Sequence, residues 1–161
     1  MIQLRDARLE DTATIVALNE AVVAVTSPMD DARFHHLFEL CDYCVVAEKD
    51  GAVIGFVMAM KKGAPYDNGN FNWFDQRLDH FLYIDRIVIS EAGRGHGVGG
   101  LLYTHVAEAA KATGSYVMAA EMDLEPPNVG SLKFHERYGF VKLGARDLES
   151  GKVVSMQVVN L

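Results

Sequence analysis

The sequence predicts an α/β protein, a mixed β-sheet flanked by helices, formed by a single domain over residues 1–161. Two observations support this prediction. Segments with the alternating pattern of strands are interleaved with segments of helical periodicity along the whole chain. In addition, residues 81–121 contain a strand, a helix and a second strand of the lengths found in a βαβ unit, which places two parallel strands in one sheet.

The first half of the chain is expected to supply one strand, two helices and a hairpin. Asp11 or Thr12 can cap the first helix, and Ser27-Pro28 ends it. Asp50-Gly51 separates two apolar runs and is typical of a hairpin turn. We therefore expect a strand at 2–5, helices at 12–23 and 30–40, and paired strands at 43–48 and 52–60.

The second half begins with an irregular segment, residues 61–80, that is rich in Gly, Asn and aromatic side chains. A connection of this length is either a functional lid, in which Trp73 would contact a substrate, or a surface loop pinned by Trp73 and Phe74. Glu149-Ser150-Gly151 then marks a second hairpin turn. The expected elements are strands at 81–89 and 116–121, helices at 101–113 and 128–138, and paired strands at 140–148 and 152–159.

Composition excludes several classes of function. The chain carries 22 acidic and 15 basic residues, a net charge of −7, and has no basic cluster for nucleic acid. No apolar run is long enough to span a membrane, and the N-terminus lacks the features of a signal peptide, so we expect a cytoplasmic protein. Cys41 and Cys44 form C-x-x-C without further ligands, which favours buried structural thiols over a metal site.

The most informative segment is residues 94–100, Arg-Gly-His-Gly-Val-Gly-Gly, between an expected strand and an expected helix. Glycines leave the backbone N–H groups accessible, and these groups lie at the positive end of the helix dipole. Arg94 adds a cation that can pair with phosphate oxygens. The segment therefore predicts a site for a ligand that carries phosphate.

Two ligands fit this segment, and a loop without any ligand is a third reading. Gly95-x-Gly97-x-x-Gly100, with Glu121 about 20 residues beyond, matches the dinucleotide fingerprint. Against it, five residues separate the strand from the first glycine, and the chain ends 40 residues after Glu121. The pattern R-x-x-G-x-G, formed by Arg94, Gly97 and Gly99, is the reading we favour.

With its preceding Ile87-Val88-Ile89, this pattern resembles the acetyl-CoA pyrophosphate loop of the GCN5-related N-acetyltransferases, the GNAT superfamily. Residues 2–7 with Asp11 resemble the first strand and helix of that family, and Asn128 with residues 134–140 resembles its second signature. The resemblance implies a mostly antiparallel central sheet, splayed at the cofactor strands and flanked by helices.

The resemblance also implies the cofactor site. Main-chain groups of Ile87, Val88 and Ile89 are expected to pair with the pantetheine arm and polarise the acetyl carbonyl. The phosphates are expected at the loop, and Asn128 is expected to complete the site. The loop residues concerned are Arg94, Gly95, His96, Gly97, Val98, Gly99 and Gly100.

Two residues are candidates for acid–base chemistry. Glu121, at the end of the strand beside the cofactor strand, resembles the family's acidic residue and is expected to deprotonate the amine. His135 occupies the place where the family often has a Tyr as general acid, and it can donate a proton to the departing thiolate. Asp85, on the cofactor strand, is expected to contact the acceptor; Asp123 and Glu125 could bind a cationic amine.

We therefore interpret the chain as an acetyl-CoA-dependent N-acetyltransferase that acts on the amine of a small, amino-acid-like molecule and uses no metal. The alternatives are an enzyme that acetylates protein N-termini or lysines, a non-catalytic acyl-CoA-binding protein on the same fold, and a dinucleotide-binding module. No nucleic-acid or membrane partner is expected, and the sequence allows a homodimer.

Overall fold

The computed structural model describes residues 1–161 and contains one seven-stranded sheet in the order β1-β2-β3-β4-β5-β7-β6. All neighbouring strands are antiparallel except β4 and β5, so the expected mixed, mostly antiparallel sheet is confirmed. None of the helices combines the length and the apolar composition that crossing a bilayer requires. The strands are β1 (Ile2–Asp6), β2 (Tyr43–Lys49), β3 (Ala52–Lys61), β4 (Phe81–Ile89), β5 (Val117–Glu125), β6 (Val141–Asp147) and β7 (Val153–Asn160).

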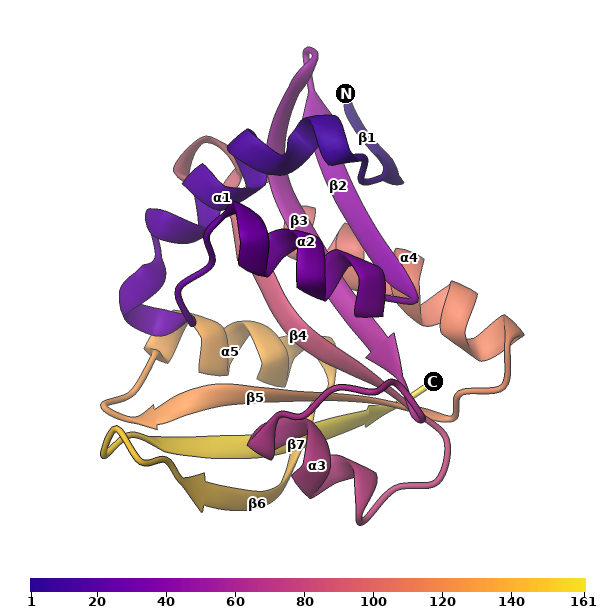
Figure 1. Ribbon diagram of the computed structural model, residues 1–161, viewed down its shortest axis with the longest axis vertical. Coiled ribbons are helices and arrows are strands. Elements are labelled where there is room, and N and C mark those ends of the chain that lie inside the picture. The colour runs from indigo at the N-terminus through magenta and orange to yellow at the C-terminus, as the bar shows by residue number, and fades with distance from the viewer.

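Helices cover both faces of the sheet (Figure 1). One face packs against α1, α2 and α3 through residues such as Ile15, Phe34 and Phe74, and the other packs against α4 and α5. The two apolar clusters arise because alternate residues of each strand point to opposite faces. The helices are α1 (Thr12–Glu20), α2 (Asp31–Leu40), α3 (Gly69–Asp75), α4 (Val98–Ala112) and α5 (Val129–Tyr138).

Part of the segment expected to be irregular is helical. Asn68 accepts hydrogen bonds from the N–H groups of Asn70 and Phe71 and so caps α3. Phe71 and Phe74, three residues apart on one face of this helix, are both buried. The prediction missed the helix because Gly and Asn dominate its start, and these residues favour turns by propensity.

The sheet opens in the middle. The parallel strands β4 and β5 pair only from Phe81 to Tyr83 on β4 and from Val117 to Ala119 on β5. Beyond these three residue pairs the strands diverge, as Figure 1 shows by the different directions of β4 and β5. The splayed sheet implied by the resemblance is therefore present, and it leaves the β5-facing edge of β4 without a partner strand from residue 84 onward.

A β-bulge shapes the same stretch of β4. Arg86 pairs with Met58 of β3 and Ile84 pairs with Ala59, so Asp85 has no partner. A bulge of one residue bends the strand and changes the direction of its side chains. As a result Asp85 and Arg86 both face the α1 side of the sheet, where Asp85 meets Tyr66 and Arg86 meets Asn19.

The two cysteines of the C-x-x-C motif are both free, and Cys44 is buried. Burial is the main cause that raises the pKa of the Cys44 thiol to about 12. The interpretation of Cys44 as a buried structural thiol is confirmed.

Candidate functional site

The glycine segment forms a turn that leads directly into α4. Gly95 and Gly97 have φ angles of +80° and +71°, in the left-handed region that favours glycine. Gly97 is the residue before α4, which begins at Val98 rather than at the expected residue 101. No backbone carbonyl accepts a hydrogen bond from the N–H groups of residues 95–100. These donors surround the start of a 15-residue helix, which is the arrangement that binds phosphate.

This turn borders a groove of about 790 Å³, the loop groove, lined by residues 87–89, by the turn and by α5. Arg94 lines its rim and is exposed. Gly99 lies at the floor, where a Cβ atom would stand 2.8 Å from the Phe134 ring of α5. Glycine at position 99 thus allows α4 and α5 to approach each other below the groove. His96 is exposed and does not line the groove.

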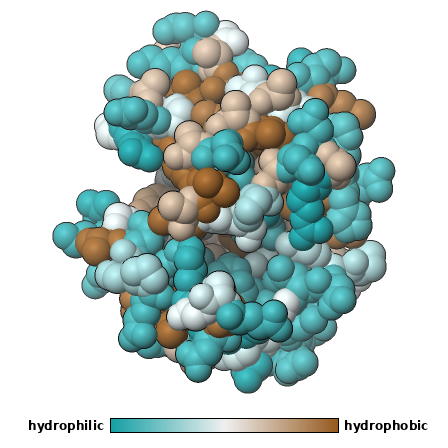
Figure 2. All heavy atoms as spheres, turned by 60° about the vertical axis from the view of Figure 1, so that its left-hand side comes forward, coloured by the Kyte–Doolittle hydropathy of each residue, from teal (hydrophilic) through white to brown (hydrophobic).

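A second cavity of about 420 Å³, the inner cavity, lies where β4 and β5 separate. It is enclosed by β4, β5, α5, the segment after α1 and the β6–β7 hairpin. Figure 2 shows a notch in the surface between the parts of the molecule that carry these elements, with hydrophobic side chains around it. The residues that line both the loop groove and the inner cavity are Val22, Val25, Ile87, Val88, Asn128, Ser131 and His135, so the two spaces are continuous.

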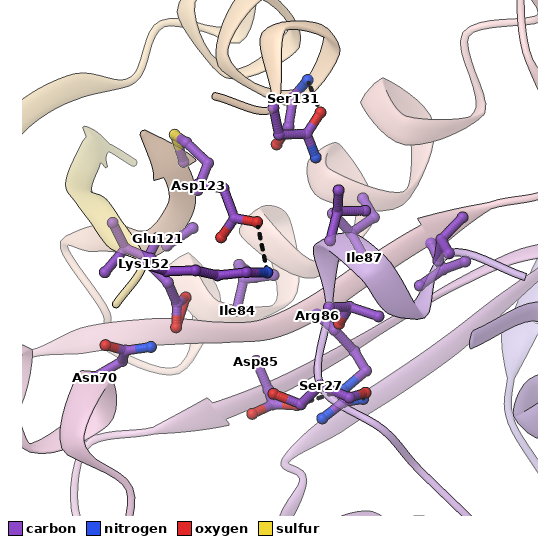
Figure 3. Close-up of a pocket in the computed structure, with 18 of the residues that line it drawn as sticks. Ser27, Asn70, Ile84, Asp85, Arg86, Ile87, Glu121, Asp123, Ser131 and Lys152 are labelled. Carbon is purple, nitrogen blue, oxygen red and sulfur yellow. Dashed lines mark hydrogen bonds and ion pairs between the residues drawn. The ribbon is translucent and has the colours of Figure 1, made fainter. Parts of the chain in front are cut away.

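Glu121 of β5 is the central carboxylate of the inner cavity (Figure 3). It accepts a hydrogen bond from the buried Tyr83 hydroxyl, and the Asn70 side chain donates another. Asn70 is oriented by Arg146, which donates to its carbonyl oxygen and leaves its amide nitrogen for Glu121. Burial is the main cause that raises the pKa of Glu121 to about 7, and the charge of Asp85 adds to it. Such a carboxylate can accept a proton near neutral pH.

Asp85 and Arg86 form a buried ion pair behind Glu121. The Arg86 Nε donates to Asp85 Oδ2 at 2.8 Å, and the side chains are 5% and 4% exposed. Asp85 also accepts from the Tyr66 hydroxyl at 2.6 Å. Arg86 Nη1 donates to Asn19 Oδ1 and to the Ser27 carbonyl, both at 3.0 Å. The pair therefore fastens the segment after α1 to the bulge of β4.

A second ion pair lies on the opposite wall. Lys152, just before β7, donates to Asp123 Oδ2 of β5 at 3.2 Å and to the Ala24 carbonyl at 2.9 Å. The side chain of Asp123 is therefore occupied by Lys152, and Glu125 is exposed outside the cavity. The structure does not bring these two carboxylates together with Glu121 as a binding site for a cationic amine.

His135 of α5 is buried, with 3% of its surface exposed, and it is paired on both sides. Its Nδ1 lies 2.7 Å from the Ser131 carbonyl, so Nδ1 carries the proton. Its Nε2 lies 2.6 Å from the hydroxyl of the buried Tyr103 of α4, which is then the donor. Burial lowers the pKa of His135 and raises that of Tyr103 well above its usual range. In this arrangement neutral His135 directs no proton into the cavity.

A sequence comparison fits a site with this geometry. Residues 9–140, more than half of the chain, match the sequence model of the acetyltransferase (GNAT) family. The chain belongs to that family. The family assignment inferred from the loop and the second signature is thus confirmed. A comparison with curated proteins found no match.

Solved structures with the GNAT fold superpose along the whole chain. Ard1 from Thermoplasma volcanium has a TM-score of 0.79, with 15% identity over 99% of this chain and 97% of that one. YncA, a putative acetyltransferase from Salmonella typhimurium solved with its cofactor acetyl-CoA, has a TM-score of 0.73, with 20% identity over 100% and 94%. The ribosomal-protein-S18-alanine N-acetyltransferase from Escherichia coli has a TM-score of 0.73, with 12% identity over 99% and 94%.

The geometry brings most of the expected site residues together. Glu121, Asp85, Asn128 and His135 line the inner cavity, and the glycine segment other than His96 lines the loop groove, together with Ile89. Trp73 is the exception among the side chains, because its ring lies against Gly144 of β6 and under the Arg77 guanidinium, 3.9 Å from it. The expected contact of Trp73 with substrate does not fit this position.

Five side chains of the site were not expected from the sequence. Those that contact the candidate catalytic groups or close the cavity are Asn70, Tyr83, Arg86, Tyr103 and Lys152. Arg86 interrupts an apolar run, which is the kind of signal that could have been noticed. The two tyrosines read as ordinary core residues within their strand and helix. No cluster of three or more His, Cys, Asp or Glu side chains could hold a metal ion.

Proposed function

We propose that this GNAT protein transfers the acetyl group of acetyl-CoA directly to the amine of a small acceptor. The observation that carries the proposal is Glu121, a shielded carboxylate with a pKa of about 7, in a cavity continuous with a phosphate-binding groove. The pyrophosphate would bind the free N–H groups of residues 95–100 and Arg94. The pantetheine arm would follow the unpaired edge of β4 toward Ile87 and Val88, which line both spaces.

The residues around the junction account for each step of the transfer. Glu121 takes a proton from the bound ammonium, and the neutral nitrogen attacks the thioester carbonyl carbon. The main-chain N–H group of Ile87 on β4, which points to the side without a partner strand because the neighbouring N–H groups face β3, stabilises the oxyanion that forms. The nitrogen, positively charged after the attack, releases its second proton to solvent as the carbon–sulfur bond breaks, which leaves the neutral amide and a thiolate that requires a proton.

For that proton we propose the Tyr103–His135 pair rather than His135 acting alone. When Nε2 of His135 is protonated, the hydrogen bond between the two reverses, and the Tyr103 O–H is free to turn toward the cavity that it lines. The thiolate takes this proton, and His135 returns one to Tyr103. Because burial lowers the pKa of His135, the protonated state is a minority at neutral pH, so the pair contributes less than an ideal general acid.

A small acceptor is favoured over a protein because the inner cavity, about 420 Å³, has the size of a small-molecule site. The solved structures of this fold include enzymes named for protein substrates, such as the ribosomal-protein-S18-alanine N-acetyltransferase, so acceptor class is the point to test. A non-catalytic acyl-CoA-binding protein would have no need of a carboxylate with a pKa near neutrality in the inner cavity.

The test combines ligand binding with turnover. Acetyl-CoA should raise the midpoint of thermal unfolding and NADH should not. Mass spectrometry of a mixed panel of amino acids, amines and peptides should then show acetylation of small amines, with Glu121→Gln lowering the rate by at least tenfold while acetyl-CoA still binds. Binding of acetyl-CoA without any acetylated product would support the non-catalytic alternative, and efficient acetylation of peptides alone would contradict the small acceptor.

A further inference from the structure

Two cationic side chains line the inner cavity, and they differ in exposure and in the number of hydrogen bonds that they make. Arg86 is 5% exposed and donates to Asp85, to Asn19 and to the Ser27 carbonyl. Three of its five N–H donors hold the fold, and burial keeps the rest of the guanidinium away from solvent. Lys152 is 31% exposed and is held by one carbonyl at 2.9 Å and one carboxylate oxygen at 3.2 Å. An ammonium group has three N–H donors, so one donor of Lys152 remains.

The remaining donor lies on the wall of the inner cavity. Lys152 starts beyond the β6–β7 turn, and Figure 3 shows its side chain extended past Glu121 toward Asp123. Its bond to the Ala24 carbonyl joins the hairpin to the segment after α1. The cavity wall between these two segments is therefore closed by a cation.

The spacing between Glu121 and this cation suits a molecule with two charges. Glu121 and Asp123 lie two residues apart on β5, which corresponds to about 7 Å along a strand, and both line the cavity. Lys152 Nζ lies 3.2 Å from Asp123 Oδ2, so the ammonium is placed beside Asp123, two residues along the strand from Glu121. An amine and a carboxylate carried on one carbon atom, each with a hydrogen bond of about 2.8 Å, can bridge groups at this separation.

The charges of the cavity favour the same kind of acceptor. Asp85 pairs with Arg86, Asp123 takes one donor of Lys152, and Glu121 is the partner for an amine. A plain amine would forgo a charge-assisted hydrogen bond to the third donor of Lys152, and a diamine would place a second positive charge beside it. A carboxylate avoids both costs and forms a charge-assisted hydrogen bond.

We propose that the acceptor is a free amino acid or a close analogue, whose carboxylate binds Lys152 while its amine lies at Glu121. This proposal rests on the acetyl transfer proposed above and adds to it a residue that determines specificity. A protein N-terminus carries an amide in place of that carboxylate, so Lys152 also discriminates against it.

The experiment compares matched acceptors. kcat/KM is measured for the twenty free amino acids, for their amides and for the corresponding decarboxylated amines, with wild type, Lys152→Ala, Lys152→Arg and the control Lys142→Ala. Lys142 is an exposed lysine on β6 that lines neither cavity. We expect wild type to prefer at least one free acid over its amide by tenfold or more. Lys152→Ala should lower kcat/KM for that acid by about 10- to 100-fold, mainly through KM, and leave the amide within about twofold.

Lys152→Arg should restore most of the preference, because it keeps the charge, and Lys142→Ala should match wild type. The proposal is overturned by equal use of acids and amides in wild type, by equal losses on both in Lys152→Ala, or by acetylation of no free amino acid. The first two results would leave acetyl transfer intact. Failure of acetyl-CoA to bind would instead contradict the function proposed above, and the thermal shift with acetyl-CoA separates that case and also confirms that each variant is folded.

Discussion

Replacing Glu121 by glutamine should stabilise the protein strongly at alkaline pH and much less at pH 5. The pKa of Glu121 rises from an ordinary value of 4.5 to about 7 in the folded protein, chiefly through burial. Between these two values the unfolded chain is ionised while the folded protein keeps the proton, so raising the pH favours unfolding. A pKa difference of about 2.5 corresponds to about 3 kcal/mol, fully expressed above pH 7. Glutamine has nearly the same shape, does not ionise, and retains an oxygen for the Tyr83 hydroxyl.

The measurement is the free energy of unfolding by urea at pH 5, 6, 7 and 8 for both proteins. The advantage of Glu121→Gln should grow from about 1 kcal/mol at pH 5 to about 3 kcal/mol at pH 8. Glu108→Gln, at an exposed carboxylate of α4, is the matched control and should show no such growth. If the difference between wild type and Glu121→Gln stays below about 1 kcal/mol and does not change with pH, Glu121 is an ordinary solvated carboxylate. Its role as a base tuned to neutral pH would then be refuted.

Three further predictions concern turnover and cofactor binding. Asp85→Asn removes a negative charge that raises the pKa of Glu121, so the acid limb of kcat/KM should move to lower pH; a limb that stays in place or moves up would contradict this coupling. Gly97→Val should abolish the thermal shift with acetyl-CoA, because a branched residue is strained at φ +71°. The control Gly114→Val, at φ +100° beyond the other end of α4, should destabilise the protein and keep the shift. In steady-state assays, Tyr103→Phe and His135→Ala should each lower kcat by about 10- to 100-fold, and the double variant should lower kcat no further than either single variant. Reductions in kcat that multiply would show that the two residues do not act as one unit.

The sequence was sufficient for most of the elements because each has a local cause. Alternating apolar residues define β2 and β3, and Asp50-Gly51 defines their turn, where both residues have positive φ angles. The glycine segment was readable because its chemistry depends on main-chain groups, and only glycines at 95 and 97 allow that backbone. Glu121 was found because it ends the apolar part of its strand, although β5 continues to residue 125.

The parts that escaped prediction depend on contacts between distant segments. In the sequence Lys152 resembles any surface lysine beside a turn, and its place on the cavity wall depends on its hydrogen bond to the Ala24 carbonyl, 128 residues away. Tyr103 is identical in pattern to the other core residues of α4 until α5 places His135 against it. The proton positions on His135 follow from the Ser131 carbonyl, and the sequence alone allowed a donor to face the cavity instead.

The unpaired residue in β4, Asp85, is an insertion that does not change which face of the sheet the other residues of the strand point to. Ile84 and Arg86 already pair with the adjacent residues Ala59 and Met58, so deletion of Asp85 would leave every other residue of the strand on its present face. Such a deletion would produce a straighter β4, able to follow β5 beyond Tyr83 and to close the space that the bend now keeps open. The same deletion would leave the buried Arg86 without its carboxylate, which destabilises the fold. The inserted residue thus supplies both the bend that keeps the cavity open and the partner of a buried charge.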